Sequence, residues 1–247
     1  MLRPAALLLL VIACAGAHAD EVQVAVAANF TAPMKLIAAN FERDTGHKVL
    51  ASFGATGKFY AQVQNGAPFD ILLAADDQTP ARLEKEGAAV AATRFTYAVG
   101  KLVLWSAQPG LVDDKGEVLR KGAFAHVALA DPKLAPYGAA AVEILRKLDL
   151  YEALEPKFVM GENIAQAHQF VASGAAPLGF VAMSQVIEGG KLKSGSAWFV
   201  PAGMYSPLRQ DAVLLGKGRN NPAARAFLQY LKGERARSVI RSFGYDL

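Results

Sequence analysis

Residues 21–59 read EVQVAVAANFTAPMKLIAANFERDTGHKVLASFGATGKF, and their hydrophobic pattern decides the fold class. Apolar runs at 21–28 and 48–53 have the length of strands, and a segment of helical period at 32–44 separates them. Pro33 suits the first turn of that helix. A strand, a helix and a second strand in this order predict two parallel strands with a helix packed across them.

The same alternation of strand-length and helical segments continues to the C-terminus. It predicts an α/β protein of two lobes, each a mostly parallel sheet flanked by helices. Extended segments at 95–106 and 207–215 are expected to cross between the lobes, so that lobe one holds both ends of the mature chain. Further strands are expected at 69–75, 126–130, 177–184 and 211–215, and further helices at 58–64, 80–86, 139–148, 164–173, 222–232 and 235–243.

The N-terminal segment has the layout of a secretory signal peptide: one Arg, an unbroken apolar run, and small residues ending at Ala19. Neither this run nor any later one reaches the roughly 18 apolar residues of a membrane span, so a soluble periplasmic protein is expected. The residues around Cys14 also resemble a lipoprotein processing box, and lipid anchoring is the alternative. The predicted division is a signal peptide at 1–19, lobe one at 20–96, lobe two at 97–208 and a return to lobe one at 209–247.

Composition narrows the function classes. The chain carries 26 Lys and Arg against 22 Asp and Glu, and these charges are interspersed, which disfavours a nucleic-acid partner. Cys14 is the one cysteine, so disulfides, thiol catalysis and cysteine metal sites are excluded from the mature chain unless Cys14 is acylated. The histidines lack metal-ligand spacing, and hydrolase, zinc-peptidase and Walker motifs are missing. A cation site at Asp70, Asp76 and Asp77 stays open.

Small and polar residues stand where several predicted strands end and helices begin. Asn29 follows the first strand, Thr56 the second and Tyr137 the strand at 126–130, while residues 161–163 precede another helix. The carboxyl ends of parallel strands meet at one edge of a sheet, so these helix starts are expected to share a crevice. Converging helix starts offer unpaired backbone N–H groups, which bind an anion without Lys or Arg. Taken singly, each residue is also an ordinary helix cap.

The run VAVAANFTAPMKLIAANFERDTGHKV and the following SFGATGKFYAQVQNGAPFDILLAAD resemble the start of the mature periplasmic molybdate-binding proteins of ABC transporters. The similarity continues through TRFTYAVGKLVLWS, ADPKLAPYG and ENIAQAHQFVASGAAPLGFVAMSQ to YLKGERARSVIRSFGYDL. This resemblance implies a bilobal type II periplasmic-binding fold that holds molybdate or tungstate between its lobes and delivers it to an inner-membrane ABC permease. A monomer without enzymatic activity or a cofactor is expected.

Two positions depart from the common pattern of that family, and the first is Asn29, where many members have Ser. The Tyr of the final lobe-two strand is Ala182 here, and Tyr137 resembles the phenol that compensates for it in another branch. In that branch a hydroxyl residue often stands at the position of Ala28, so only a backbone N–H contact is implied there. Carried over position by position, the implied contacts with the oxyanion are Asn29 with its neighbour Ala28, Thr56, Tyr137 and the backbone of Ile164.

Other functions would fit parts of the same pattern. A receptor for sulfate, thiosulfate or another oxyanion would use the same scaffold, and a molybdate site must reject sulfate by size. Phosphate is disfavoured because it carries a proton part of the time at neutral pH and the expected shell has no carboxylate to accept it. A secreted hydrolase would need a nucleophile in contact with a base, and neither Thr56 nor Tyr137 has a predicted His partner.

Overall fold

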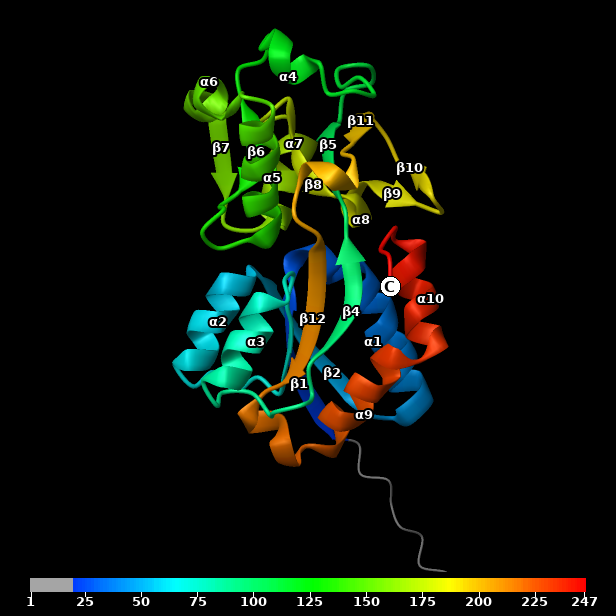
Figure 1. Ribbon diagram of the computed structural model, residues 1–247. Helices are drawn as coiled ribbons and strands as arrows, with labels where there is room; N and C mark the ends of the chain where they lie inside the picture. Colours follow the sequence, from blue (N-terminus) through cyan, green and yellow to red (C-terminus); the bar gives the residue numbers. More distant parts are fainter. Residues whose placement is uncertain (1–19) are drawn as a thin grey trace, which may run out of the picture.

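The computed structural model describes residues 20–247. The predicted signal peptide and the lipidation alternative at Cys14 lie outside these residues. Two five-stranded sheets, one above the other in Figure 1, are flanked by helices and form two lobes, which confirms the predicted fold class. Within residues 20–247, no helix is both long enough and apolar enough to cross a bilayer.

The sheet of lobe one is built mainly from the first part of the chain. Three neighbouring strands at one side of the sheet pair in parallel. Both antiparallel strand pairs of the sheet involve the strand at 208–214. Four of its five strands therefore point the same way, and the strand at 208–214 runs against them. In spatial order the strands are β2 (Lys48–Gly54), β1 (Glu21–Ala27), β3 (Ile71–Leu73), β12 (Leu208–Leu214) and β4 (Phe95–Gly100).

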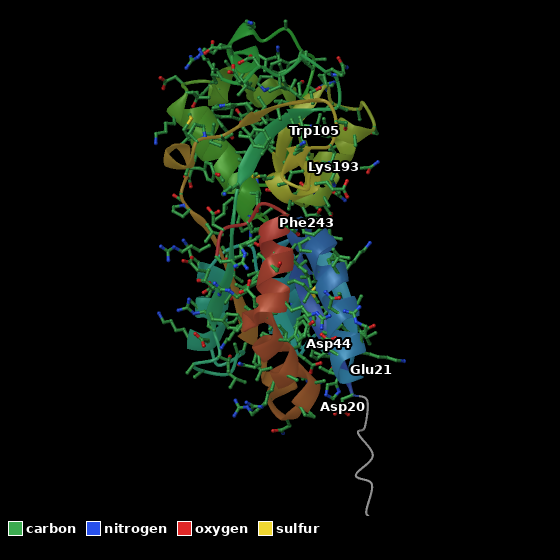
Figure 2. All side chains as sticks on the ribbon, turned by 90° about the vertical axis from the view of Figure 1, so that its right-hand side faces the viewer. Asp20, Glu21, Asp44, Trp105, Lys193 and Phe243 are labelled. Atoms are coloured by element: carbon green, nitrogen blue, oxygen red, sulfur yellow. The ribbon has the colours of Figure 1, made fainter. Side chains whose placement is uncertain are left out.

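Helices cover both faces of this sheet, because successive side chains of β1 point to opposite faces and both are apolar. Val24 packs with α1, α9 and α10, which lie side by side in Figures 1 and 2, whereas Ala25 packs with α2 and α3. The helices are α1 (Thr31–Thr45), α2 (Thr56–Gln64), α3 (Gln78–Lys85), α9 (Pro222–Lys232) and α10 (Glu234–Ser242), with 3-10 turns η1 (Ala28–Phe30) and η4 (Gly216–Asn220).

The sheet of lobe two repeats this arrangement. Again four of the five strands point the same way, and the exception is the strand at 102–106, which is antiparallel to both neighbours. Its strands in spatial order are β11 (Ser196–Phe199), β5 (Leu102–Ser106), β8 (Leu178–Ala182), β6 (Val127–Ala130) and β7 (Phe158–Gly161). Around it lie α4 (Val118–Lys121), α5 (Pro136–Lys147), α6 (Tyr151–Leu154), α7 (Ile164–Ala172), α8 (Met183–Val186), η2 (Glu155–Lys157), η3 (Ala202–Met204) and the hairpin of β9 (Ile187–Glu188) and β10 (Lys191–Leu192).

The two strands that run against their sheets belong to the segments that pass between the lobes. The predicted strand at 95–106 is in fact two strands: β4 pairs in lobe one and ends at Gly100, and β5 begins at Leu102 in lobe two. The return strand β12 begins at Leu208, three residues before the expected strand at 211–215. Edge strands β7 and β11 were not expected, because each has four residues and mostly half-exposed side chains.

Candidate functional site

A small cavity lies between the lobes, where the ends of β1 and β2 meet the starts of four helices. Its empty space is about 200 Å³, part of it open to solvent. All five residues that the sequence singled out line this one cavity: Ala28, Asn29, Thr56, Tyr137 and Ile164. The other lining residues are Ala27, Gly54, Ala55, Ala75, Ala135, Pro136 and Asn163.

Each lobe contributes two helix starts to the cavity. In lobe one η1 begins at Ala28 and α2 at Thr56, and in lobe two α5 begins at Pro136 and α7 at Ile164. The first N–H groups of a helix have no partner inside it, and they carry the positive end of its dipole. The Asn163 side chain caps α7 by accepting hydrogen bonds from Ala165 and Gln166, which leaves the N–H of Ile164 to face the cavity. The arrangement favours an anion.

The cavity is uncharged, and three of its polar side chains are buried. None of its lining residues is ionisable in the physiological range, and Asn29, Thr56 and Tyr137 are each at most 3 % exposed. Two charged residues that lie close in sequence to lining residues pair with each other across the cleft, because the Lys58 ammonium lies 2.6 Å from the Glu162 carboxylate of the other lobe. Hydrogen bonds to a charged ligand are stronger in such a site than in water, because the local dielectric is low.

Two hydroxyl groups in the cavity are arranged as donors. The Thr56 hydroxyl accepts a hydrogen bond from the backbone N–H of Ala75 at 3.0 Å, and the Tyr137 hydroxyl accepts one from the side-chain amide of Gln210 at 3.0 Å. Among residues 20–247 neither hydroxyl donates a well-formed hydrogen bond to a protein acceptor, although the Tyr137 phenol lies close enough to Tyr245 to oppose the rise in pKa that burial causes there. Each therefore keeps its own proton for a ligand, and a ligand without protons satisfies both.

The phenol of Tyr137 stays protonated over the physiological range. Burial, followed by the nearby phenols of Tyr245 and Tyr97, raises its pKa well above the ordinary value. Burial likewise raises the pKa of Tyr245 to about 12, although hydrogen bonds with neighbours oppose the shift. The donor strength of the site is therefore independent of pH near neutrality.

The Asn29 side chain faces the protein. Its Nδ2 donates to Gln210 Oε1 at 2.8 Å and to the Tyr245 hydroxyl at 3.0 Å, so both amide hydrogens are used. Its backbone carbonyl accepts from Ser184 Oγ of lobe two and from Tyr245. A contact from residue 29 to an anion therefore falls to its backbone N–H.

Gln210, Tyr245 and Ser184 are the residues that reasoning from sequence missed. They lie far along the chain from the cavity residues they hold, and Asn29 and Gln210 are separated by 181 positions. The available signal was the polar pair Gln210-Asp211 inside the otherwise apolar end of the run LRQDAVLL. Both side chains are buried, so the pair marks a place where a strand turns polar groups inward.

The structure does not assemble the aspartates Asp70, Asp76 and Asp77 into a cation site, and it places His168 away from the cavity. Asp70 accepts hydrogen bonds from the Gln23 backbone and the Asn221 amide, and Asp76 caps the turn at Thr79. No group of three or more His, Cys, Asp or Glu side chains in the described part of the chain could hold a metal ion. His168 lies in lobe two, stacked on Trp105 with 5.1 Å between ring centroids. It is not among the residues that line the cavity.

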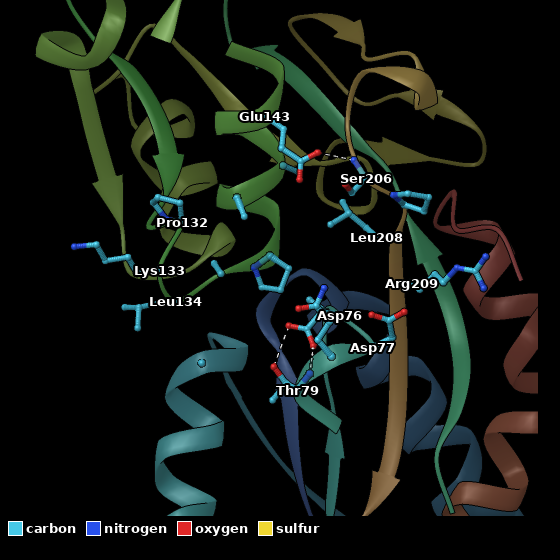
Figure 3. Close-up of a pocket in the computed structure, with 18 residues that line it drawn as sticks. Asp76, Asp77, Thr79, Pro132, Lys133, Leu134, Glu143, Ser206, Leu208 and Arg209 are labelled. Atoms are coloured by element: carbon cyan, nitrogen blue, oxygen red, sulfur yellow. Dashed lines mark hydrogen bonds between the residues drawn. The ribbon is translucent and has the colours of Figure 1, made fainter. Parts of the chain in front are cut away.

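A larger groove opens beside the cavity, and Figure 3 shows its lining. The groove shares Ala75, Ala135 and Pro136 with the cavity and has about 780 Å³ of empty space, including open solvent. Its carboxylates come from both lobes, with Asp76 near the start of α3 and Glu143 on α5. Three carboxylates and two cations line it: Asp76, Asp77, Glu143, Lys133 and Arg209.

Comparisons with known proteins agree with this geometry. A family model described as bacterial extracellular solute-binding protein matches residues 22–246. Proteins named molybdate-binding protein ModA from Azotobacter vinelandii and Rhodobacter capsulatus are 66% and 56% identical, over 96% and 93% of this chain and 93% and 89% of their own lengths.

A solved structure, the periplasmic molybdate-binding protein of Azotobacter vinelandii, superposes with a TM-score of 0.89 at 42% identity, covering 92% of this chain and 99% of that one. The family is one of transport proteins and not of enzymes. The chain belongs to the bacterial extracellular solute-binding protein family, in the group of the ModA proteins.

Proposed function

We propose that this protein captures molybdate, and tungstate with it, in the cavity between its lobes and delivers the anion to an ABC permease. The observation that carries the proposal is a small, uncharged cavity between the lobes whose two hydroxyl groups are both set as donors. Relatives at 66% and 56% identity bear the name molybdate-binding protein, which supports molybdate as the ligand.

The proposed ligand shell consists only of hydrogen-bond donors. The hydroxyls of Thr56 and Tyr137 supply two of them, and the first N–H groups of the converging helices supply the others. A fully ionised tetrahedral oxyanion has only acceptors, so it matches this shell without a mismatch. The residues proposed to contact the ligand are Ala28, Asn29, Thr56, Tyr137 and Ile164.

Capture is proposed to proceed by closure of the two lobes about the segments that pass between them, which connect β4 to β5 and lead back into β12. Three contacts across the cleft support a closed state: Gly57 N–H to the Leu134 carbonyl at 2.9 Å, Ser184 Oγ to the Asn29 carbonyl at 2.9 Å, and the Lys58–Glu162 ion pair. We infer that the permease recognises this closed form and that the receptor works as a periplasmic monomer.

Other candidates fit less well. A hydrolase would need a base beside its nucleophile, yet the hydroxyls of Thr56 and Tyr137 contact an amide N–H each and no His or carboxylate. Phosphate would bind less favourably because it carries a proton part of the time at neutral pH, and that proton would face hydrogen-bond donors with no acceptor to receive it. Sulfate matches the donors and differs from molybdate in size, so it is the competitor that an experiment must include.

Calorimetric titration of residues 20–247 with molybdate, tungstate, sulfate and phosphate tests the proposal. We expect tight binding of the first two anions and much weaker binding of the others. Molybdate at 100 times its dissociation constant should also add about 2.7 kcal/mol to the free energy of unfolding. Equal affinities for sulfate and molybdate would overturn the molybdate assignment.

A further inference from the structure

Gln210 is a fully buried polar residue that lies between the two lobes without lining the cavity. It belongs to β12, at the point where the pairing with β4 shifts register between Gln210 and Asp211. This bulge places two successive side chains inside the protein. Asp211 pairs with Arg94 of lobe one, whereas Gln210 reaches toward the ligand site.

The amide of Gln210 links a predicted contact residue of each lobe. Its Oε1 accepts from Asn29 Nδ2 at 2.8 Å and lies 3.1 Å from the Tyr97 hydroxyl, whose single proton is shared with the Ala74 carbonyl at 3.0 Å. Its Nε2 donates to the Tyr137 hydroxyl at 3.0 Å. Asn29 and Tyr97 belong to lobe one and Tyr137 to α5 of lobe two, so the chain of hydrogen bonds spans the cleft.

This chain of hydrogen bonds has a direction. Because the Asn29 amide donates to the carbonyl oxygen of the Gln210 amide, the NH₂ group of Gln210 faces Tyr137. A hydroxyl that accepts a hydrogen bond on one side is left with its own proton on the other. The Tyr137 phenol is thereby fixed as a donor, and it does not present its oxygen lone pairs to the cavity.

The main chain makes room for this contact. A Cβ atom at Gly100 would overlap the Tyr137 hydroxyl and the Gln210 amide. Gly100 is the last residue of β4, so the crossing segment itself leaves the space in which the two side chains meet. The contact therefore depends on residues of lobe one, lobe two and the crossing strand.

We propose that Gln210 is a positioning residue of the ligand site, which presets the Tyr137 hydroxyl as a donor and so favours oxyanions that carry no proton. This inference rests on the proposed function. Gln210 acts through Tyr137 and not by touching the anion. Loss of its amide lets the hydroxyl rotate, which weakens molybdate binding and allows the oxygen to accept a hydrogen bond from a protonated anion.

A double-mutant cycle with Gln210→Leu and Tyr137→Phe tests this coupling by calorimetry with molybdate. Gln210→Leu alone should weaken binding about five- to tenfold, since it removes one neutral hydrogen bond behind the donor. In the Tyr137→Phe background the same change should alter affinity less than about threefold. Additive effects would overturn the inference.

Anion selectivity gives a readout that a purely structural role would not move. Arsenate is a tetrahedral oxyanion that, unlike molybdate, still carries protons in mildly acidic and neutral solution. Gln210→Leu should reduce the ratio of molybdate to arsenate affinity at least about fivefold, and it should not do so in the Tyr137→Phe background. Equal weakening of both anions would show that Gln210 merely supports the fold.

Controls keep the outcome interpretable. Ser106→Ala removes another fully buried polar group, whose Oγ donates to the Pro177 carbonyl in lobe two, and it should lower stability without changing selectivity. If Gln210→Leu does not fold, Gln210→Met preserves the length of the side chain and is measured in its place. If the wild type binds no molybdate, the proposed function fails; if it binds but the cycle is additive, only the role of Gln210 fails.

Discussion

The cavity between the lobes and the groove beside it share lining residues, yet they differ in chemistry. The cavity is small and uncharged, and its two hydroxyl groups are set as donors. The groove is several times larger and carries three carboxylates against two cations. An anion is therefore accommodated by oriented neutral dipoles, while the larger and more highly charged hollow is unfavourable to it.

Desolvation accounts for this difference. A cation buried in the cavity would need its own compensation whenever the ligand is absent, whereas an N–H or O–H group costs much less to bury. Charges remain where water or a partner reaches them: Glu143 accepts from the backbone of Ser206, and Arg209 is exposed. The groove fits an approach to the site better than a site of its own.

Gly100→Ala is expected to have the largest effect on the cavity. The added Cβ would displace the Tyr137 hydroxyl and the Gln210 amide when the lobes are closed. Strain of about 1–3 kcal/mol from overpacking, together with a lost donor, should weaken molybdate binding about 100-fold or more. Calorimetry measures this, and Gly203→Ala is the matched control because no atom lies near its added Cβ. Unchanged affinity for Gly100→Ala would contradict the described closed geometry.

A comparison of Tyr137→Phe in the cavity with Glu143→Gln in the groove shows which of the two binds the anion. Removal of one hydrogen bond to a charged ligand, worth about 1.5–3 kcal/mol, should weaken molybdate binding about 10- to 100-fold. Glu143→Gln in the groove keeps an acceptor for the Ser206 N–H and should change affinity less than about threefold. If the two substitutions had equal effects, the groove would have to be part of the site.

Asp76→Asn should alter stability more than binding. Burial raises the pKa of the Asp76 carboxyl, so its ionised form lowers the free energy of unfolding once the pH exceeds the unfolded-state value. Asn can still accept from the Thr79 N–H and can donate to its hydroxyl. At pH 7 we expect a melting temperature higher by about 1–3 °C, with the gain shrinking as the pH approaches about 4.

Melting curves of both proteins across this pH range provide the check. A gain that grew as the pH fell would have the wrong sign for a raised carboxyl pKa. The molybdate affinity of Asp76→Asn should stay within about threefold of the wild type, because the carboxylate lines the groove and not the cavity.

The smallest expected effect is that of pH on the molybdate affinity of the wild-type protein. The Tyr137 pKa is raised well above its ordinary value, and no lining residue of the cavity titrates near neutrality. Molybdate affinity should therefore vary less than about threefold between about pH 6 and pH 8.5. A steep change in that interval would point to a charged group in the ligand shell.

Much of the site followed from local patterns. The helical period placed the start of α7 at Ile164, whereas α2 and α5 begin two and three residues before the expected 58 and 139, and η1 was not expected. The rule that ligands bind at the carboxyl ends of parallel strands brought Asn29, Thr56, Tyr137 and Ile164 to one cavity. The break at Gly100 was not foreseen, because an apolar run does not reveal that its two halves pair in different sheets.

The sequence by itself determined the alternation of strands and helices, the two-lobed α/β class and the set of helix starts suited to an anion, because each depends on neighbours within a few residues. Only the tertiary structure decided which groups face the ligand. The Asn29 amide turns to Gln210 and Tyr245, and Gln210 turns the Tyr137 proton toward the cavity. These hydrogen bonds join residues 73 to 216 positions apart, so no local pattern encodes them.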